Sequence, residues 1–308
     1  MVPMPKEFKT IEELVELLRR RGVVTDDATS AVLRRESYYA VVNGYKEPFL
    51  DRDAMQSSSE DVYKQGTTFA SIHDLFLFDR ALRNLSLPHL ISAETIIKNA
   101  VVYSFCHEHR QALDYLDARN YVDAKSMLVP PGFKGNKAAA HRKNLKKLIS
   151  ILEGKTKLGP ETKPYVRHYI ERYGQVPLWV LQNDLTFGNI SHFYQLQKRG
   201  VQNAACRTVA EVNGNGRRIG ARDLLDATRI LVDYRNTCAH DERLYCARLK
   251  GHGFDHMLDA LSMIVPHDEM VEFQASVFMV LESFRGRVHP SALNAMYTDP
   301  KDIPAEFI

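Results

Sequence analysis

The 308-residue chain is poor in cysteine, and its four cysteines form no CxxC pair. This scatter disfavours a disulfide framework and a closed zinc knuckle, because both need closely and regularly spaced cysteines. We therefore expect reduced thiols. The sequence also lacks the roughly 18 uninterrupted apolar residues of a membrane span, and residues 1–7 hold no apolar signal core. We accordingly expect a cytoplasmic protein without a membrane partner.

Possible metal ligands concentrate in one run, Cys-His-Glu-His at 106–109. Neighbouring residues of a helix point in different directions, and no second ligand pair lies nearby in the sequence. We interpret this run as a polar helix end, and we expect neither a metal ion nor a cofactor.

Neither sign of charge dominates, since 41 Lys and Arg face 38 Asp and Glu, for a net charge of +3. The distribution is uneven, however. Residues 134–172 carry eleven Lys or Arg against three Glu, a net charge of +8, whereas residues 255–308 carry nine acidic against three basic side chains, a net charge of −6. The asymmetry is compatible with a basic face for a polyanion and an acidic tail packed elsewhere. A merely solvated helical face explains the basic stretch equally well.

Strand-like alternation and internal repeats are also missing, and helical periodicity fills most of the chain. Apolar spacing predicts the helices that follow: 11–18 closed by Gly22, 25–45 from a Thr-Asp-Asp cap, 69–105, 138–152, 161–173, 221–238, and two between 254 and 284. A Gly-Asn-Gly turn at 214–216 precedes the helix at 221–238, and Pro88 is expected to kink or break the longest one. The predicted fold class is all-α.

One hexapeptide, Arg-Asn-Thr-Cys-Ala-His at 235–240, carries residue types suited to cutting RNA without a metal. Cleavage needs groups that take the 2′-OH proton and protonate the departing 5′ oxygen, and histidine does both near neutral pH. His240 is therefore the candidate acid or base. Arg235 presents a charged planar fork that matches phosphate oxygens, and Asn236 is suited to orienting the His or binding the scissile phosphate.

The spacing of this motif creates a geometric difficulty. Residues five apart on an ideal helix lie about 140° around from each other, so Arg235 and His240 cannot share a face of one straight helix. Either the helix ends between them, or two copies of the motif meet across a twofold axis. The second option also provides the second histidine that acid and base catalysis wants, so we predict a homodimer.

By itself the pattern is weak, because Arg83-Asn84 with His89 nearly repeats it inside the long apolar helix. We interpret that copy as structural. For the motif at 235–240, a buried Arg235 paired with Asp233 or Asp241, together with a hydrogen-bonded core His240, explains the same residues without catalysis.

The residues on both sides of the hexapeptide carry a longer sequence pattern. Residues 234–245 resemble the signature of the Abi-like (abortive infection, AbiD/AbiF type) proteins of the HEPN ribonuclease superfamily. Further landmarks follow in the order of that family: Ser37-Tyr38-Tyr39, Asn43-Gly44-Tyr45, Phe78-Asp79-Arg80-Ala81-Leu82-Arg83, Glu94, Pro177-Leu178-Trp179 and Leu185-Thr186-Phe187-Gly188. The resemblance covers roughly residues 10–250.

This resemblance implies a HEPN-type helical bundle, with additional N- and C-terminal helices, that dimerises through the motif helices. The implied activity is metal-independent RNA cleavage that leaves a 2′,3′-cyclic phosphate and a 5′-OH, in phage defence or as a toxin with an RNA or protein antitoxin. Arg235, Asn236 and His240 match the catalytic positions. The expected domains are 1–250, with a basic helical insertion around 134–172, and an acidic helical extension at 251–308 packed on the same body.

Other side chains are weaker candidates for RNA contact. Arg243 matches a family position, where a phosphate contact and a helix-cap salt bridge are equal alternatives. Arg80 and Lys98 are candidates for the same cleft, although Arg80 could simply pair with Asp79 or Glu94. Stacking on bases is a further possibility for three aromatic residues, which core packing explains as well: Tyr39, Tyr45 and Trp179. The competing functions are a noncatalytic RNA-binding HEPN module and a phage-sensing homodimer.

Overall fold

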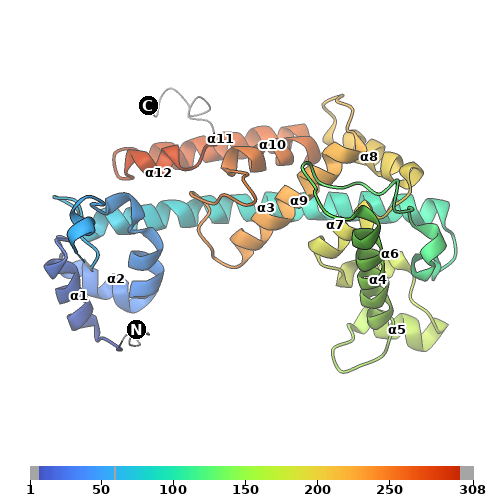
Figure 1. Ribbon diagram of the computed structural model, residues 1–308, viewed down its shortest axis with the longest axis horizontal. Helices are drawn as coiled ribbons and strands as arrows, with labels where there is room; N and C mark the ends of the chain where they lie inside the picture. Colours follow the sequence, from blue (N-terminus) through green and yellow to red (C-terminus); the bar gives the residue numbers. More distant parts are fainter. Residues whose placement is uncertain (1–6, 59, 299–308) are drawn as a thin grey trace. The chain divides into compact units, whose positions relative to one another are not determined.

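The computed structural model describes residues 7–58 and 60–298, which form an all-helical fold (Figure 1). Within these residues β-structure is limited to isolated bridges, so the predicted all-α class is confirmed. The α-helices are α1 (Ile11–Arg20), α2 (Asp27–Glu36), α3 (Phe69–Glu108), α4 (Lys137–Lys155), α5 (Pro164–Tyr173), α6 (Leu178–Leu181), α7 (Phe187–Gln195), α8 (Arg199–Asn213), α9 (Ala221–Ala239), α10 (Phe254–Ile264), α11 (His267–Ser283) and α12 (Pro290–Asn294). None of the described helices combines the length and apolar character of a bilayer-spanning segment.

The chain divides into two compact units. The first unit comprises Met1–Leu85, Asp241–Asp255 and Ala275–Ile308, and the second comprises Ser86–His240 and His256–Gln274. Helix α3 therefore gives its residues 69–85 to the first unit and 86–108 to the second. The predicted division into a domain at 1–250 and an acidic helical extension at 251–308 stays a prediction.

Helix α1 of the first unit begins and ends where the sequence indicates. Thr10 and Glu13 form a reciprocal capping box, in which each side chain accepts a hydrogen bond from the backbone N–H of the other. Gly22 follows the helix with a φ of +91°, a conformation that glycine adopts without strain. Val15 and Leu18 are buried on the face that packs against α2.

Helix α2 is shorter than predicted. It ends at Glu36, because Ser37 takes a left-handed backbone conformation with a φ of +64°, which interrupts the helical hydrogen-bond ladder. The Ser37 hydroxyl then accepts a hydrogen bond from the N–H of Ala40, and a π-helical turn occupies Tyr39–Asn43. The single helix predicted through residue 45 is thus wrong.

Helix α3 continues through Pro88, so the alternative of a break at this proline is wrong. A proline inside a helix removes one hydrogen bond and costs about 3 kcal/mol. Fully buried leucines on both sides, Leu82 and Leu90, supply packing that offsets this cost.

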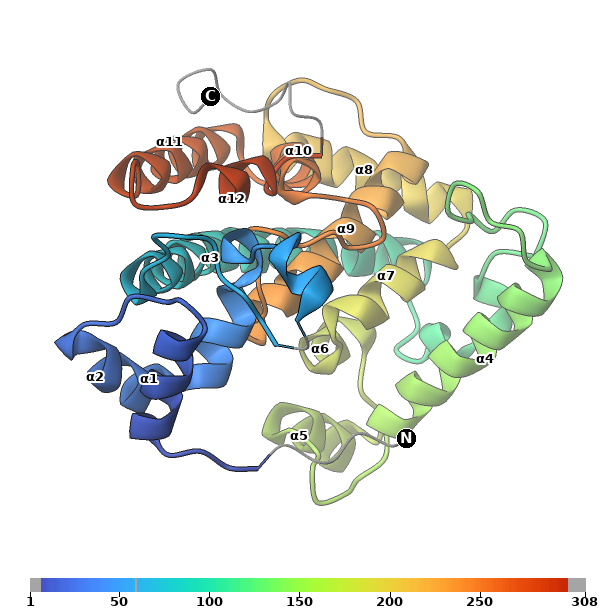
Figure 2. The ribbon, with the colours of Figure 1, turned by 60° about the vertical axis from the view of Figure 1, so that its left-hand side comes forward.

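The second unit is organised around α7 and α9. Helix α7 packs against both α4 and α9, and α8 packs against α9; Figure 2 shows α7 between α4 and α9. The predicted turn before α9 is confirmed, since Gly214 and Gly216 both have a φ of +73°. Asn213, the last residue of α8, donates its side-chain amide to the carbonyls of Ser262 and Val265, which ties α8 to the end of α10.

We predict that two adjacent residues of α3 differ sharply in their contribution to stability. Leu90 is fully buried, whereas Ile91 is 47% exposed. Leu90→Ala should lower the free energy of unfolding by about 2–5 kcal/mol because it leaves a cavity. Ile91→Ala, the matched control, should change it by less than about 0.5 kcal/mol. Urea unfolding followed by circular dichroism measures both, and equal losses would contradict the described burial of α3.

Candidate functional site

Helix α9 positions the motif at its C-terminal end. Its buried face includes Leu224 and Leu231. The helix runs through Ala239, and the N–H of His240 still donates to the carbonyl of Asn236 at 2.9 Å. The helix therefore ends immediately before His240, which is its C-cap, so the first of the two predicted solutions applies only at the last residue of the motif. Because α9 stays helical through Ala239, its end does not by itself bring Arg235 and His240 onto one face.

Arg235 is held by a carboxylate of α3. Its Nε lies 2.9 Å from Oε2 of Glu94, whose side chain is only 9% exposed, whereas the Arg235 side chain is 32% exposed. The expected partners Asp233 and Asp241 are therefore not the ones found. Because Glu94 uses Nε, the terminal nitrogens of Arg235 keep donors for other acceptors. One of them, Nη1, makes a long 3.4 Å contact with the side-chain oxygen of Asn236.

Lys98 joins this cluster from the next turn of α3. Its Nζ lies 2.9 Å from Oε1 of Glu94, so the two oxygens of one carboxylate hold two cations. The structure thus brings Lys98 and Arg235 together on one carboxylate, and the RNA contact of Lys98 stays a prediction. The role of Glu94 was not predicted, although its spacing of four residues before Lys98 is a typical helical ion-pair signal.

Asn236 and His240 are both exposed to solvent. The alternative of a core histidine is therefore wrong for His240. The amide of Asn236 and the imidazole of His240 are thus open to solvent, and Arg235 is partly so. Within residues 7–58 and 60–298, no group of three or more His, Cys, Asp or Glu is arranged to hold a metal ion.

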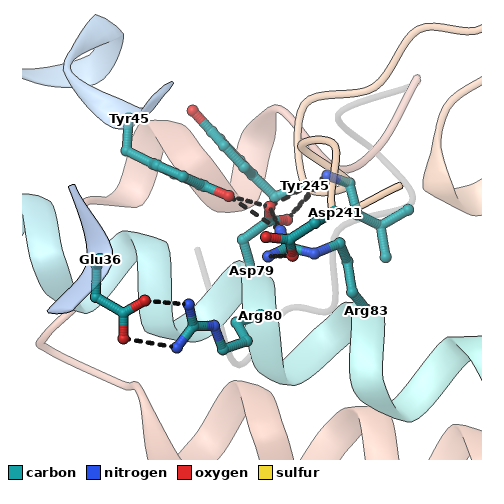
Figure 3. Close-up of polar contacts among 8 residues, drawn as sticks. Glu36, Tyr45, Asp79, Arg80, Arg83, Asp241 and Tyr245 are labelled. Carbon is teal, nitrogen blue, oxygen red and sulfur yellow. Dashed lines mark hydrogen bonds and ion pairs between the residues drawn. The ribbon is translucent and has the colours of Figure 1, made fainter. Parts of the chain in front are cut away.

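The first unit contains a buried polar network centred on Asp79 of α3, which sequence analysis missed (Figure 3). The fully buried Asp79 carboxylate accepts hydrogen bonds from the Tyr45 hydroxyl at 2.7 Å and from Arg83 Nη1 at 2.5 Å. It also accepts from the backbone N–H groups of Leu244 and Tyr245, at 3.1 and 2.6 Å. Burial, and then the adjacent carboxylate, raise the pKa of Tyr45, which keeps its phenol a donor.

Arg83 extends the network to the segment that follows the motif. Its Nη2 lies 2.6 Å from Oδ1 of Asp241, the residue after His240, and its own side chain is only 3% exposed. The arginine of the second Arg-Asn copy, Arg83, is thus buried and ion-paired. The remaining member of that copy, His89, contacts Glu269 at 2.8 Å and packs on Phe273. The available sequence signal was the spacing of four residues between Asp79 and Arg83.

Arg80 forms a two-pronged ion pair with Glu36, at 2.9 and 2.6 Å, and lies over the ring of Phe76. Glu36, and not Asp79 or Glu94, is therefore the ion-pair partner of Arg80. Hydrogen bonds and charge from Arg80, and then from Arg35, lower the pKa of Glu36 to about 2. Arg243 donates from Nη1 to the carbonyl of Gly44 at 2.9 Å. The RNA contacts of Arg80 and Arg243 stay predictions.

The three candidate aromatic residues differ in exposure. Tyr45 is buried in the Asp79 network, which leaves its ring no access to a base. Tyr39 and Trp179 are 78% and 48% exposed. Stacking on bases remains a prediction for these two residues.

Two arginines one turn apart allow a matched test of the Asp79 network. Arg83→Met leaves the buried Asp79 carboxylate without its cation and should lower the free energy of unfolding by about 3–5 kcal/mol. Arg80→Met breaks a pair in which the arginine is 34% exposed and should cost about 1 kcal/mol or less. Urea midpoints measure the difference. Similar losses of unfolding free energy in the two variants would show that burial of an ion pair does not determine its contribution to stability here.

A family model described as Abi-like protein matches residues 31–246, well over half of the chain. Neither a curated protein nor a solved structure shows significant similarity. The matched range includes the Asp79 network, Glu94 and the whole motif of α9. The chain therefore belongs to the Abi-like protein family.

Proposed function

We propose that this protein is a metal-independent endoribonuclease of a bacterial abortive-infection or toxin–antitoxin system. Membership of the Abi-like family suggests a role in abortive infection. The observation that carries the catalytic part is the end of α9, where Glu94 holds a half-buried Arg235 and His240 lies exposed. The type of reaction that we propose follows from the resemblance of residues 235–240 to the HEPN ribonuclease motif.

In the proposed reaction the 2′-hydroxyl of RNA attacks the adjacent phosphorus. The new 2′-O–P bond forms as the P–O5′ bond breaks, which gives a 2′,3′-cyclic phosphate and a 5′-OH. One imidazole takes the 2′-OH proton, and a protonated imidazole gives a proton to the leaving oxygen. The terminal nitrogens of Arg235 stabilise the charge on the phosphorane, and Asn236 binds or orients the phosphate.

A pair of chains fits this reaction better than one. Each chain supplies a single His240, whereas the reaction uses one acid and one base. Helix α9 also continues past Arg235 to Ala239, so one chain cannot place Arg235 and His240 on the same helical face. A twofold dimer that brings two motifs together provides both histidines and both arginines. An RNA or protein antitoxin is a further proposed partner.

The first test is cleavage of total RNA in EDTA, with mapping of the new ends. His240→Ala should lower the cleavage rate by about 10²–10⁴-fold, and Arg235→Ala by about 10²–10³-fold. His267→Ala, which removes another exposed histidine of the same unit, serves as the control and should cut at the parental rate. Folded His240→Ala protein that cuts RNA as fast as the parent sinks the proposal. RNA that binds but acquires no new ends supports a noncatalytic RNA-binding module instead.

The shared site predicts a dominant effect in mixed dimers. Co-expressed chains with two different affinity tags yield a dimer with one intact chain and one His240→Ala chain. Because this dimer lacks either the acid or the base, its rate should fall to that of the doubly substituted dimer, and not to half of the parental rate. A rate near one half would show that each chain cuts RNA by itself. A parent that remains monomeric while cutting RNA contradicts the shared site directly.

A further inference from the structure

Helix α4 in the second unit carries much of the basic stretch at 134–172. Its N-terminus is capped by Asn136, whose side-chain oxygen accepts from the N–H of Ala139 at 2.9 Å. Leu148 and Leu152 are buried on the face that packs against α7. Most of the remaining surface of this helix faces solvent.

Three basic residues of α4 hold the helix in place. Lys137 donates from Nζ to the carbonyl of Lys125 at 2.5 Å, and His141 Nε2 lies 2.7 Å from the carbonyl of Val122. At the other end Lys155 pairs with Asp184 at 2.7 Å. These three side chains thus have a structural role.

The other basic residues of α4, which we call the α4 basic face, are Arg142, Lys143, Lys146 and Lys147. All four are exposed, and within the described part of the chain none forms an ion pair or side-chain hydrogen bond. Their spacing places them on one side of the helix, in two rows whose members lie one turn or about 6 Å apart. No acidic residue occurs in α4 before Glu153.

This arrangement is unfavourable for the isolated helix. Like charges four residues apart repel, and α4 contains two such pairs, Arg142 with Lys146 and Lys143 with Lys147. An ordinary solvated face intersperses acids and bases, so that i and i+4 neighbours attract. A polyanion that binds across the rows relieves this repulsion.

The chemistry of the helix favours RNA over a membrane as the polyanion. A basic helix that binds a lipid surface inserts its apolar face among the acyl chains. In α4 the leucines of the apolar face are already buried against α7, and the exposed side carries the four cations. Spacing of about one helical turn also suits successive phosphates of an extended strand.

The α4 basic face is separate from the motif. Helix α7 packs against both α4 and α9, and both ribbon views place α7 between them (Figures 1 and 2). We propose that the α4 basic face is a docking surface for the phosphate backbone of single-stranded RNA, outside the cleavage site. This inference rests on the proposed function only in taking RNA as the polyanion.

The test is equilibrium binding of a labelled single-stranded RNA at several salt concentrations, in a His240→Ala background that limits cleavage. Log affinity falls as log salt rises, and four phosphate contacts contribute about 2.8 to the steepness of this fall. The double variant Lys146→Gln/Lys147→Gln removes two of these contacts and should reduce the steepness by about 1.4. Raising the salt from about 50 to about 200 mM should therefore cost the parent about sevenfold more affinity than this variant. Thermal melting checks that the variant is folded.

The matched control is Arg217→Gln/Arg218→Gln, which removes the same charge from an exposed loop of the same unit. The docking surface is supported if this control keeps an RNA affinity and a salt slope within twofold of the parent while the α4 variant loses both affinity and slope. Equal losses in both variants show a mere net-charge effect and overturn it, as does unchanged binding in the α4 variant. Binding of phosphatidylserine vesicles in place of RNA also overturns it.

Failure of the inference and failure of the proposed function are distinguishable. If RNA binding depends on α4 while the parent leaves RNA uncut, the docking surface stands and the endoribonuclease proposal fails. If the parent cuts RNA and the α4 variant binds it with unchanged affinity and slope, the endoribonuclease proposal stands and the docking surface fails.

Discussion

A single buried carboxylate, Asp79, organises the first unit. Burying a charge is unfavourable unless donors surround it, and Asp79 receives a phenol, a guanidinium and two backbone amides. The segment at 241–245 lies outside regular helices and is anchored largely by these bonds. This segment begins one residue after the proposed catalytic histidine, so the network fixes the chain where the motif ends.

Glu94 has a comparable role in the second unit, although Arg235, one of the two cations it holds, is partly exposed. It restricts Arg235 through Nε and Lys98 through Nζ, and it leaves guanidinium edges of Arg235 for a ligand. Such positioning before the substrate arrives is what makes electrostatic stabilisation effective in catalysis. The α4 basic face shows the opposite arrangement, because no carboxylate among the residues that the structure describes pairs with its four cations. One surface is therefore suited to orienting a single phosphate, and the other to attracting a long strand.

Local features of the fold were predictable from the sequence, and long-range pairs were not. Apolar periodicity predicted α9 to within one residue of its end, and Gly214 and Gly216 marked the preceding turn, because both features depend on neighbouring residues. Ser37 escaped prediction, since a left-handed residue that is not glycine depends on its surroundings. The partner of Arg235 lies 141 residues away in sequence, and several acids competed for it. Only the folded chain selects Glu94, just as it selects Glu36 for Arg80.

Asp241 shows how two demands narrow the amino acids that a position accepts. Its φ of +57° favours glycine, asparagine or aspartate, while the ion pair with Arg83 demands a carboxylate. Glycine would adopt this backbone conformation without strain but would lose the ion pair with Arg83. Glutamate would keep the negative charge but would strain the backbone. Aspartate meets both demands. A side chain that is 72% exposed is thus more restricted than many in the core, and exposure is a poor guide to mutational tolerance at this site.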